Sequence, residues 1–329
     1  MAGPSEASFS VIDASELSKE IVAGQRRALA RGITVVECAA AGAPELLRNL
    51  YPRAGRAVTI GVTGFPGAGK SSLVDRLIEH YRAAGLKVGV VAVDPSSAFS
   101  GGAILGDRVR MMRHAGDEGV FIRSMAARGH LGGLCRSAGE ALDLLDAAGY
   151  DVLIVETVGV GQSEIEIARL ADAVLVVLVP GMGDDIQAIK AGILEIADLF
   201  VINKSDRDGA DKLATELQQM LAMADEDRPK PPIVKTIALK GEGVDRLVEA
   251  IKAHLDHPET EERRRARRLE RARVRLEDIL GRALFRRVVE HGIGLDNWNK
   301  IVERLARRET DPYTAVEEIV GGSRPGEWR

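Results

Sequence analysis

The sequence predicts an α/β fold, with a mostly parallel sheet of about seven strands covered by helices on both faces and helical extensions at both ends. Apolar runs rich in Val, Ile and Leu alternate with helical stretches between residues 56 and 257. Several of these runs are continuous rather than alternating, which is typical of strands buried on both faces. The helical stretches are long enough for the right-handed crossovers that join parallel strands.

The expected strands all belong to one central domain, residues 56–257. They are Ala57–Val62, Val88–Val93, Val120–Ile122, Val152–Glu156, Val174–Val179, Leu199–Asn203 and Ile233–Ile237. In sheets of this kind a ligand binds beyond the carboxyl ends of the strands. The residues that directly follow these strands are therefore the first candidates for a functional site.

Two helical extensions flank the central domain. In residues 1–55, Asp13 and Glu16 resemble a capping pair, and a further helix is expected from about Pro44 to Leu50. We expect this extension to pack on the main domain. Residues 258–329 begin with an Arg-dense helix, Glu261–Arg275, and continue with helices that each carry one apolar stripe. Because such a stripe needs a surface to cover, we favour a homodimer formed through this arm over folding back.

Composition excludes several classes of protein. The chain has 329 residues, 45% of them hydrophobic and 29% charged, as in an ordinary globular protein. Its net charge of −4 gives no electrostatic case for nucleic acid, and no apolar run approaches a membrane span. Cys38 and Cys135 are the two cysteines, which suits a reducing compartment. We expect a cytoplasmic protein, or one of an organelle matrix.

The turn after the first strand is rich in glycine and ends in a lysine and a serine. Gly64-Phe65-Pro66-Gly67-Ala68-Gly69-Lys70-Ser71 reads G-x-x-x-x-G-K-[ST], the phosphate-binding P-loop, and Ser72 continues into a predicted helix. Glycines let backbone N–H groups close around phosphate oxygens, and the helix N-terminus adds partial positive charge. In this pattern Lys70 reaches the β- and γ-phosphates, and the Ser71 hydroxyl holds Mg²⁺.

Two later strand ends predict that the base is guanine. Asn203-Lys204-Ser205-Asp206 is an N-K-x-D motif. A carboxylate at Asp206 can accept hydrogen bonds from guanine N1–H and the 2-amino group, and adenine offers neither donor there. The next strand ends in Ala238-Leu239-Lys240, where a backbone N–H can meet guanine O6 with Lys240 near the base. The expected ligands are therefore GTP and GDP.

Acidic residues at other strand ends are candidates for the Mg²⁺ shell, because this hard cation prefers oxygen ligands. Glu156 ends a strand and begins Glu-x-x-Gly, in which the Gly159 N–H would meet the γ-phosphate. Asp94 ends another strand, and Asp107 lies in the following loop, where an ion pair with a nearby arginine would explain it equally well.

Val160 stands where Ras-like GTPases place the glutamine that orients the attacking water. Valine cannot orient water, and Gln162 lies two positions away. We therefore expect slow intrinsic hydrolysis that a partner or a rearranged switch accelerates.

Taken together, Gly64–Ser71, Asp94–Ser97, Glu156–Glu164 and Asn203–Asp206 make the chain resemble the MeaB/ArgK branch of the G3E GTPases over essentially its whole length. It is also similar to the human methylmalonic aciduria type A protein. The resemblance implies a homodimeric GTPase that chaperones adenosylcobalamin-dependent methylmalonyl-CoA mutase. Such a protein protects the mutase from inactivation and gates cofactor loading by the cobalamin adenosyltransferase.

The resemblance also implies a third switch after Pro180. There the family's pattern matches Asp184 to Lys190, with Gln187 and Lys190 coupling the nucleotide state to the mutase.

Three alternatives stay open. A nickel metallochaperone needs clustered Cys and His ligands, but here the histidines are scattered and the one close pair, His254 and His257, reads as helix surface. A P-loop kinase needs a phosphoacceptor pocket and is disfavoured by Asn203–Asp206. A non-catalytic GTP-binding scaffold is kept open by Val160, although Lys70 and Glu156 favour hydrolysis.

Overall fold

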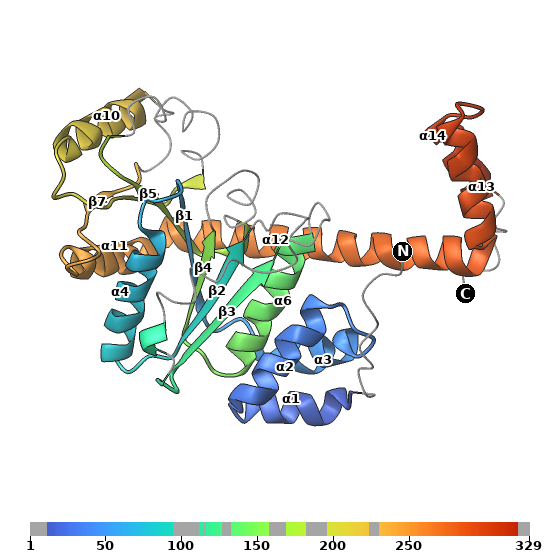
Figure 1. Cartoon of the computed structure of the whole chain (residues 1–329), viewed down its shortest axis with the longest axis horizontal. Coiled ribbons are helices and arrows are strands. Elements are labelled where there is room, and N and C mark those ends of the chain that lie inside the picture. Colours follow the sequence, from blue (N-terminus) through green and yellow to red (C-terminus); the bar gives the residue numbers. More distant parts are fainter. Residues whose placement is uncertain are drawn as a thin grey trace. The chain divides into compact units, whose positions relative to one another are not determined.

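The computed structural model describes residues 12–94, 112–114, 116–126, 133–157, 169–181, 196–223 and 230–321. Seven strands form one sheet in the order β3-β2-β4-β1-β5-β6-β7 (Figure 1). Their bounds are β1 Val58–Gly64, β2 Val88–Asp94, β3 Val120–Ala126, β4 Val152–Thr157, β5 Ala173–Leu178, β6 Leu199–Ile202 and β7 Ile233–Lys235. Every pairing is parallel, so the seven carboxyl ends lie at one edge. The predicted α/β fold is confirmed.

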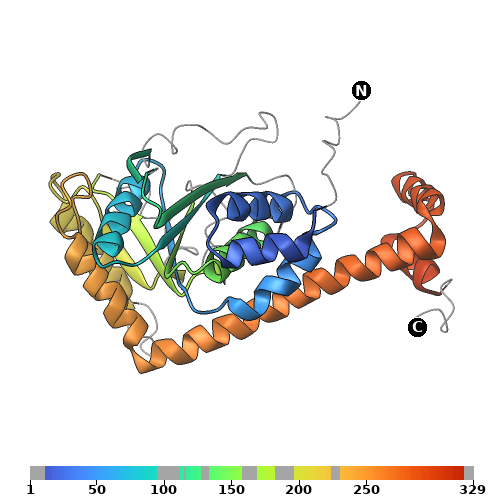
Figure 2. The same cartoon turned by 90° about the horizontal axis from the view of Figure 1, so that it is seen from below.

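Helices cover both faces of this sheet (Figures 1 and 2). On one face α4 (Lys70–Ala83) and α11 (Val244–Asp256) share a core with Leu175 and Val177 of β5. On the other face α10 (Ala210–Met223) packs against Val174, Val176 and Leu178 of the same strand. The alternation within one strand explains why the run from 173 to 178 is apolar at every position.

The N-terminal helices are part of the main core. α1 (Ala14–Val22), α2 (Arg26–Glu37) and α3 (Ala43–Leu50) lie beside α6 (Gly133–Ala147), and their apolar side chains share one cluster with it (Figure 2). The packing is close, because a Cβ added to Gly32 would lie 2.7 Å from Cδ1 of Ile21 and 3.0 Å from Cδ2 of Leu144. The predicted cap of α1 is confirmed, since Oδ1 of Asp13 accepts a hydrogen bond from the Glu16 N–H at 2.9 Å. A short 3₁₀ turn, Tyr51–Arg53, leads on toward β1.

The contacts of the chain separate a first unit, residues 1–265, from a second, residues 266–329. α12 (Pro258–Phe285) runs from one into the other, and is followed by a π-helix (Arg286–Ile293), α13 (Leu295–Ala306) and α14 (Pro312–Gly321).

The second unit has a small core of its own. Val289, Ala315 and Ile319 are buried, and the rings of Phe285 and Trp298 meet edge-on with centroids 5.1 Å apart. Several apolar side chains of α12 are exposed, among them Leu276, Leu280 and Leu284. The homodimer expected from such a stripe stays a prediction. Among the residues described, no helix combines the length and apolarity that a membrane span requires.

Candidate nucleotide-binding site

The turn between β1 and α4 needs glycine for reasons of backbone conformation and of space. Gly64, Gly67 and Gly69 have φ values of +136°, +77° and +86°, a region that side chains disfavour. A Cβ on Gly64 would lie 2.2 Å from the Val177 carbonyl oxygen, and one on Gly69 would lie 2.5 Å from Nδ2 of Asn203. The loop is thus held against β5 and the strand end at Asn203.

Lys70 begins α4 and is 5% exposed. Its Nζ donates to the carbonyl oxygens of Gly64 at 2.7 Å and Phe65 at 3.0 Å, so its ammonium lies at the inner side of the turn. The N-terminus of this 14-residue helix directs its partial positive charge at the same loop. A buried ammonium beside a helix N-terminus is an arrangement that can bind the phosphates of a nucleotide.

Ser71 and Glu156 meet across the sheet edge. The Ser71 hydroxyl of α4 donates to Oε1 of Glu156 at the end of β4, at 2.7 Å, and both residues are buried. In register, Glu156 lies opposite Val62 of β1 and Ala92 of β2, so it occupies the centre of the carboxyl edge. A hydroxyl oxygen and a carboxylate oxygen in contact form a donor set that fits Mg²⁺.

Asn203 joins the phosphate side of the site to the base side. Its Nδ2 donates to the Ala68 carbonyl oxygen of the P-loop at 2.8 Å, and its Oδ1 accepts from the Ala238 N–H at 3.0 Å. These two partners fix the orientation of the amide. The neighbouring Lys204 has φ +56° and donates through Nζ to the Gly67 carbonyl oxygen at 2.7 Å. The two motifs predicted from sequence are therefore one connected structure.

The base side is open to solvent. Asp206 and Lys240 are exposed, with Oδ2 and Nζ 3.9 Å apart. The Ala238 N–H is used by Asn203, and the Lys240 N–H donates to the Ile237 carbonyl oxygen at 2.9 Å. Within the described part of the chain, the Leu239 N–H is the one in this turn that makes no hydrogen bond. It is therefore the backbone donor of this turn that a bound ligand could use.

Several predicted residues lie where the structure gives no account of them. Asp94 ends β2, but its side chain is outside the description. The other such positions, all outside the described residues, are Asp107, Gly159, Val160, Gln162, Asp184, Gln187 and Lys190. Pro66 and Ser72 are described and occupy the predicted turn and the first turn of α4.

Sequence reasoning missed Arg76, which lies on α4 and contacts the turn of residues 238–240, here called the base turn. Its Nε donates to the Ala238 carbonyl oxygen at 3.0 Å and its Nη2 to the Leu239 carbonyl oxygen at 2.8 Å. The sequence position of Arg76, six residues after Lys70, gave no indication of this contact, because an arginine on a helix is usually solvated.

The prediction that the histidine pair lies on a helix surface is wrong for His254. Its side chain is mostly buried, with Nε2 3.7 Å from Oδ1 of Asp198, and both residues line a cavity of about 360 Å³. His257 also lines this cavity but is exposed. The cavity lies at the amino ends of the strands, because Asp198 directly precedes β6, and so away from the P-loop.

Comparison with known proteins identifies similar chains over nearly the whole length. The sequence model of the family described as methylmalonyl-CoA mutase-associated GTPase MeaB matches residues 29–292. A Pyrococcus abyssi protein described as a GTPase is 47% identical over 315 residues, which cover 93% of this chain and 97% of that protein. The mouse mitochondrial methylmalonic aciduria type A homolog is 38% identical over 243 residues, covering 68% of this chain and 59% of the mouse protein. A solved structure described as LAO/AO transport system kinase is 29% identical with a TM-score of 0.64, covering 97% and 99% of the two chains.

Proposed function

This chain belongs to the MeaB family of G3E GTPases, and from that premise we propose that it is a GTP-hydrolysing chaperone of adenosylcobalamin-dependent methylmalonyl-CoA mutase. In this role it protects the mutase from inactivation and gates cofactor loading by the adenosyltransferase. The family's description and the mouse relative's name support the client. We also propose that residues 258–329 form a homodimer.

The single observation that carries the hydrolytic part is the buried Ser71–Glu156 pair beside the ammonium of Lys70. Lys70 would exchange the carbonyl oxygens of its own loop for the β- and γ-phosphate oxygens, with the P-loop N–H groups closing around them. Ser71 and Glu156, with Asp94 and Asp107 as further candidates, would hold Mg²⁺. When bound, this ion neutralises charge that develops on the phosphate oxygens. Gly159 would donate its N–H to the γ-phosphate.

Base recognition would use the exposed side of the same site. Asp206 would accept from guanine N1–H and the 2-amino group, and the Leu239 N–H would donate to O6 with Lys240 beside the ring. Asn203 hydrogen-bonds both the P-loop at Ala68 and the base turn at Ala238, so the base and the phosphates would be bound by one connected structure. The kinase alternative does not explain the guanine donor and acceptor pattern, and the nickel alternative needs clustered Cys and His ligands, which the sequence scatters.

The step that remains slow in the isolated protein is positioning of the attacking water. Val160 offers no polar atom for this, so we propose that a mutase-induced rearrangement supplies it. Gln162, Asp184, Gln187 and Lys190 are the proposed coupling residues.

The test is phosphate release from GTP, measured with the purified protein alone and then with methylmalonyl-CoA mutase. We expect a slow basal rate that rises severalfold with the mutase, and no comparable release from ATP. A fast basal rate that the mutase leaves unchanged would remove both the client and the argument from Val160.

Asp206→Asn tests the base assignment in the same assay. The amide cannot accept from both guanine donors, so GTP affinity should fall about 10- to 100-fold, because a hydrogen bond to a charged group contributes about 1.5–3 kcal/mol. Xanthosine triphosphate, whose 2-oxo group accepts a hydrogen bond, should gain affinity in the variant. Equal GTP affinity in wild type and variant would contradict the assignment.

A further inference from the structure

Arg76 holds the turn that would face the guanine ring. It lies on α4, the helix that begins at the P-loop, and its guanidinium reaches two successive carbonyl oxygens of the turn, those of Ala238 and Leu239. The third side of its fork is also engaged, because Nη1 donates to Oε2 of Glu79 at 2.7 Å. A guanidinium is planar and rigid, so its two contacts with the turn, oriented by the third contact with Glu79, fix the turn more firmly than a lysine could.

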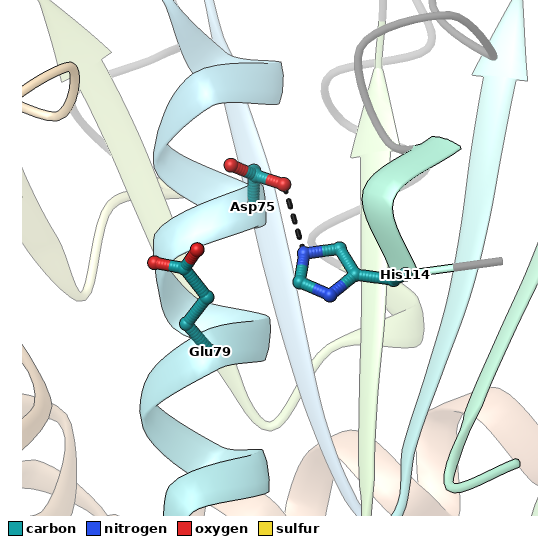
Figure 3. A group of neighbouring side chains, drawn as sticks. All are labelled: Asp75, Glu79 and His114. Carbon is teal, nitrogen blue, oxygen red and sulfur yellow. Dashed lines mark hydrogen bonds and ion pairs between the residues drawn. The ribbon is translucent and has the colours of Figure 1, made fainter. Parts of the chain in front are cut away.

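Glu79 also contacts an ion-pair cluster formed by Asp75 of the same helix and by Arg113 and His114 of the 3₁₀ turn Met112–His114; Figure 3 shows Asp75, Glu79 and His114 of this group. Oε1 of Glu79 lies 3.0 Å from Nη1 of Arg113, and Nε of Arg113 donates to Oδ1 of the buried Asp75 at 2.8 Å. His114 Nε2 lies 2.8 Å from the same Asp75 oxygen. The network therefore runs from the base turn, through α4, to the 3₁₀ turn Met112–His114 that precedes β3.

Asp75, Glu79 and His114 bring one ligand atom each within 4.8 Å of one another, which is a donor set for a divalent cation. Arg113, however, contacts both carboxylates and supplies the positive charge that a metal ion would bring. The pKa of His114 is lowered, first by burial and then by Arg113, which is consistent with a neutral imidazole that donates to Asp75. The cluster is therefore better explained as a support for Glu79 than as a metal centre.

We propose that Arg76 is a positioning residue for guanine recognition. It holds the Ala238–Leu239 turn so that the Leu239 N–H points at the base, and Glu79, fixed by Arg113, holds Arg76. This inference rests on the proposed GTP-binding function and adds a determinant of its base specificity. In this proposal Arg76 acts through the turn and not through the nucleotide itself, so its effect should depend on the O6 acceptor and not on the phosphates.

The experiment is a binding cycle that pairs a residue change with a ligand change. Dissociation constants of GDP, of IDP and of 2-aminopurine riboside diphosphate are measured for wild type and Arg76→Ala by calorimetry. IDP lacks the 2-amino group but keeps O6 and N1–H, whereas the 2-aminopurine analogue lacks both O6 and N1–H, so each ligand is compared with itself in wild type and variant. Arg76→Ala should weaken GDP and IDP alike, by about tenfold, the factor that corresponds to one good hydrogen bond. It should weaken the 2-aminopurine analogue by about twofold or less.

Arg82→Ala is the matched control. Arg82 also lies on α4 and makes a comparable network, with two hydrogen bonds to Asp117 at 2.8 and 2.9 Å and one to the Leu86 carbonyl oxygen. Its loss should lower the melting temperature but leave the three nucleotides in their wild-type ratio. If Arg76→Ala does not fold, Arg76→Lys keeps the charge beside Glu79 and should show the same ligand pattern with about a threefold effect.

The outcomes separate the inference from the function on which it rests. Wild-type protein that does not bind GDP overturns the proposed function. Wild-type binding that depends on O6, together with equal losses for all three ligands in the Arg76 variants, overturns the inference alone. Unchanged affinities in folded Arg76→Ala would overturn it as well.

Discussion

The two edges of the sheet both bury carboxylates, but they use them differently. At the carboxyl edge, Glu156 is 4% exposed and contacts the hydroxyl of Ser71. At the amino edge, Asp172 and Asp198 are 3% and 4% exposed, and they accept the backbone N–H groups of Thr59 at 3.0 Å and Val174 at 2.9 Å. Burial alone therefore does not separate the two groups.

The partners of these carboxylates separate them. A serine hydroxyl can exchange a carboxylate for a ligand, whereas a strand's N–H cannot leave its acceptor without weakening the sheet. Asp151 follows the same rule as the other amino-edge acids, since its Oδ2 accepts the Lys87 N–H at 2.8 Å. The acids directly before the strands thus hold backbone N–H groups, whereas Glu156, at the end of β4, contacts a side chain of the candidate site.

The largest effect is expected for Lys70→Ala, which tests whether the carboxyl edge has a catalytic role that the amino edge lacks. The ammonium would stabilise charge on the phosphates, so its removal should lower GTP hydrolysis by about 10²–10³-fold, as for loss of one preorganised donor. Phosphate release at saturating GTP measures the effect. Lys19→Ala, a change on α1, is the control and should keep the wild-type rate. A Lys70 variant with near-normal turnover would mean that the carboxyl edge is as structural as the amino edge.

Asp172→Asn at the amino edge should have the opposite profile. Its Oδ2 would no longer offer a charged acceptor to the Thr59 N–H, which should cost about 1–3 kcal/mol of unfolding free energy. Urea unfolding measures the loss. GTP hydrolysis should stay within about twofold of wild type, because a distant structural change removes no transition-state interaction. A large fall in turnover without loss of stability would give this edge a functional role.

A smaller and pH-dependent effect is expected at Asp117, beside β3. The pKa of Asp117 is held below its ordinary value of 3.8 by the hydrogen bond from Arg82, with a further contribution from the Gly119 N–H. A lowered native pKa adds stability that is complete above the unfolded value and is lost as pH falls through the native one.

Asp117→Asn should therefore be less stable than wild type at pH 7, by up to about 1 kcal/mol for a partly exposed pair. The difference should shrink as unfolding is measured at pH 4 and below. A gap that stays constant over that range would show that packing, and not the charge, causes it.

The strands and the nucleotide motifs could be predicted because their signals are local. A continuous apolar run identifies a strand, and Gly64–Ser71 and Asn203–Asp206 are spaced motifs that follow directly after such runs. What was missed depends on contacts across the fold. Arg76 reads as an ordinary surface arginine until α11 and β7 bring the 238–240 turn to it.

The extension 1–55 was predicted to be helical, but the bounds of α2 within it were not, for a related reason. The second half of α2, Gly-Ile-Thr-Val-Val, is weak in intrinsic helix propensity, and its formation depends on packing against α6. Gly159 and Gln187 lie outside the residues that the structure describes, so the switch remains a prediction from the sequence.

The shared core of α1, α2, α3 and α6 bears on where the chain can be cut. Residue 55 marks a change of secondary structure, and it is the natural place to trim a recombinant fragment to its GTPase part. Such a fragment would remove Leu29, Ile33 and Leu46 from the core that they share with α6, and would leave Leu144 of α6 facing water. Exposed leucines on a sheet-covering helix favour aggregation. A minimal soluble fragment should therefore begin ahead of α1 and not at the P-loop strand.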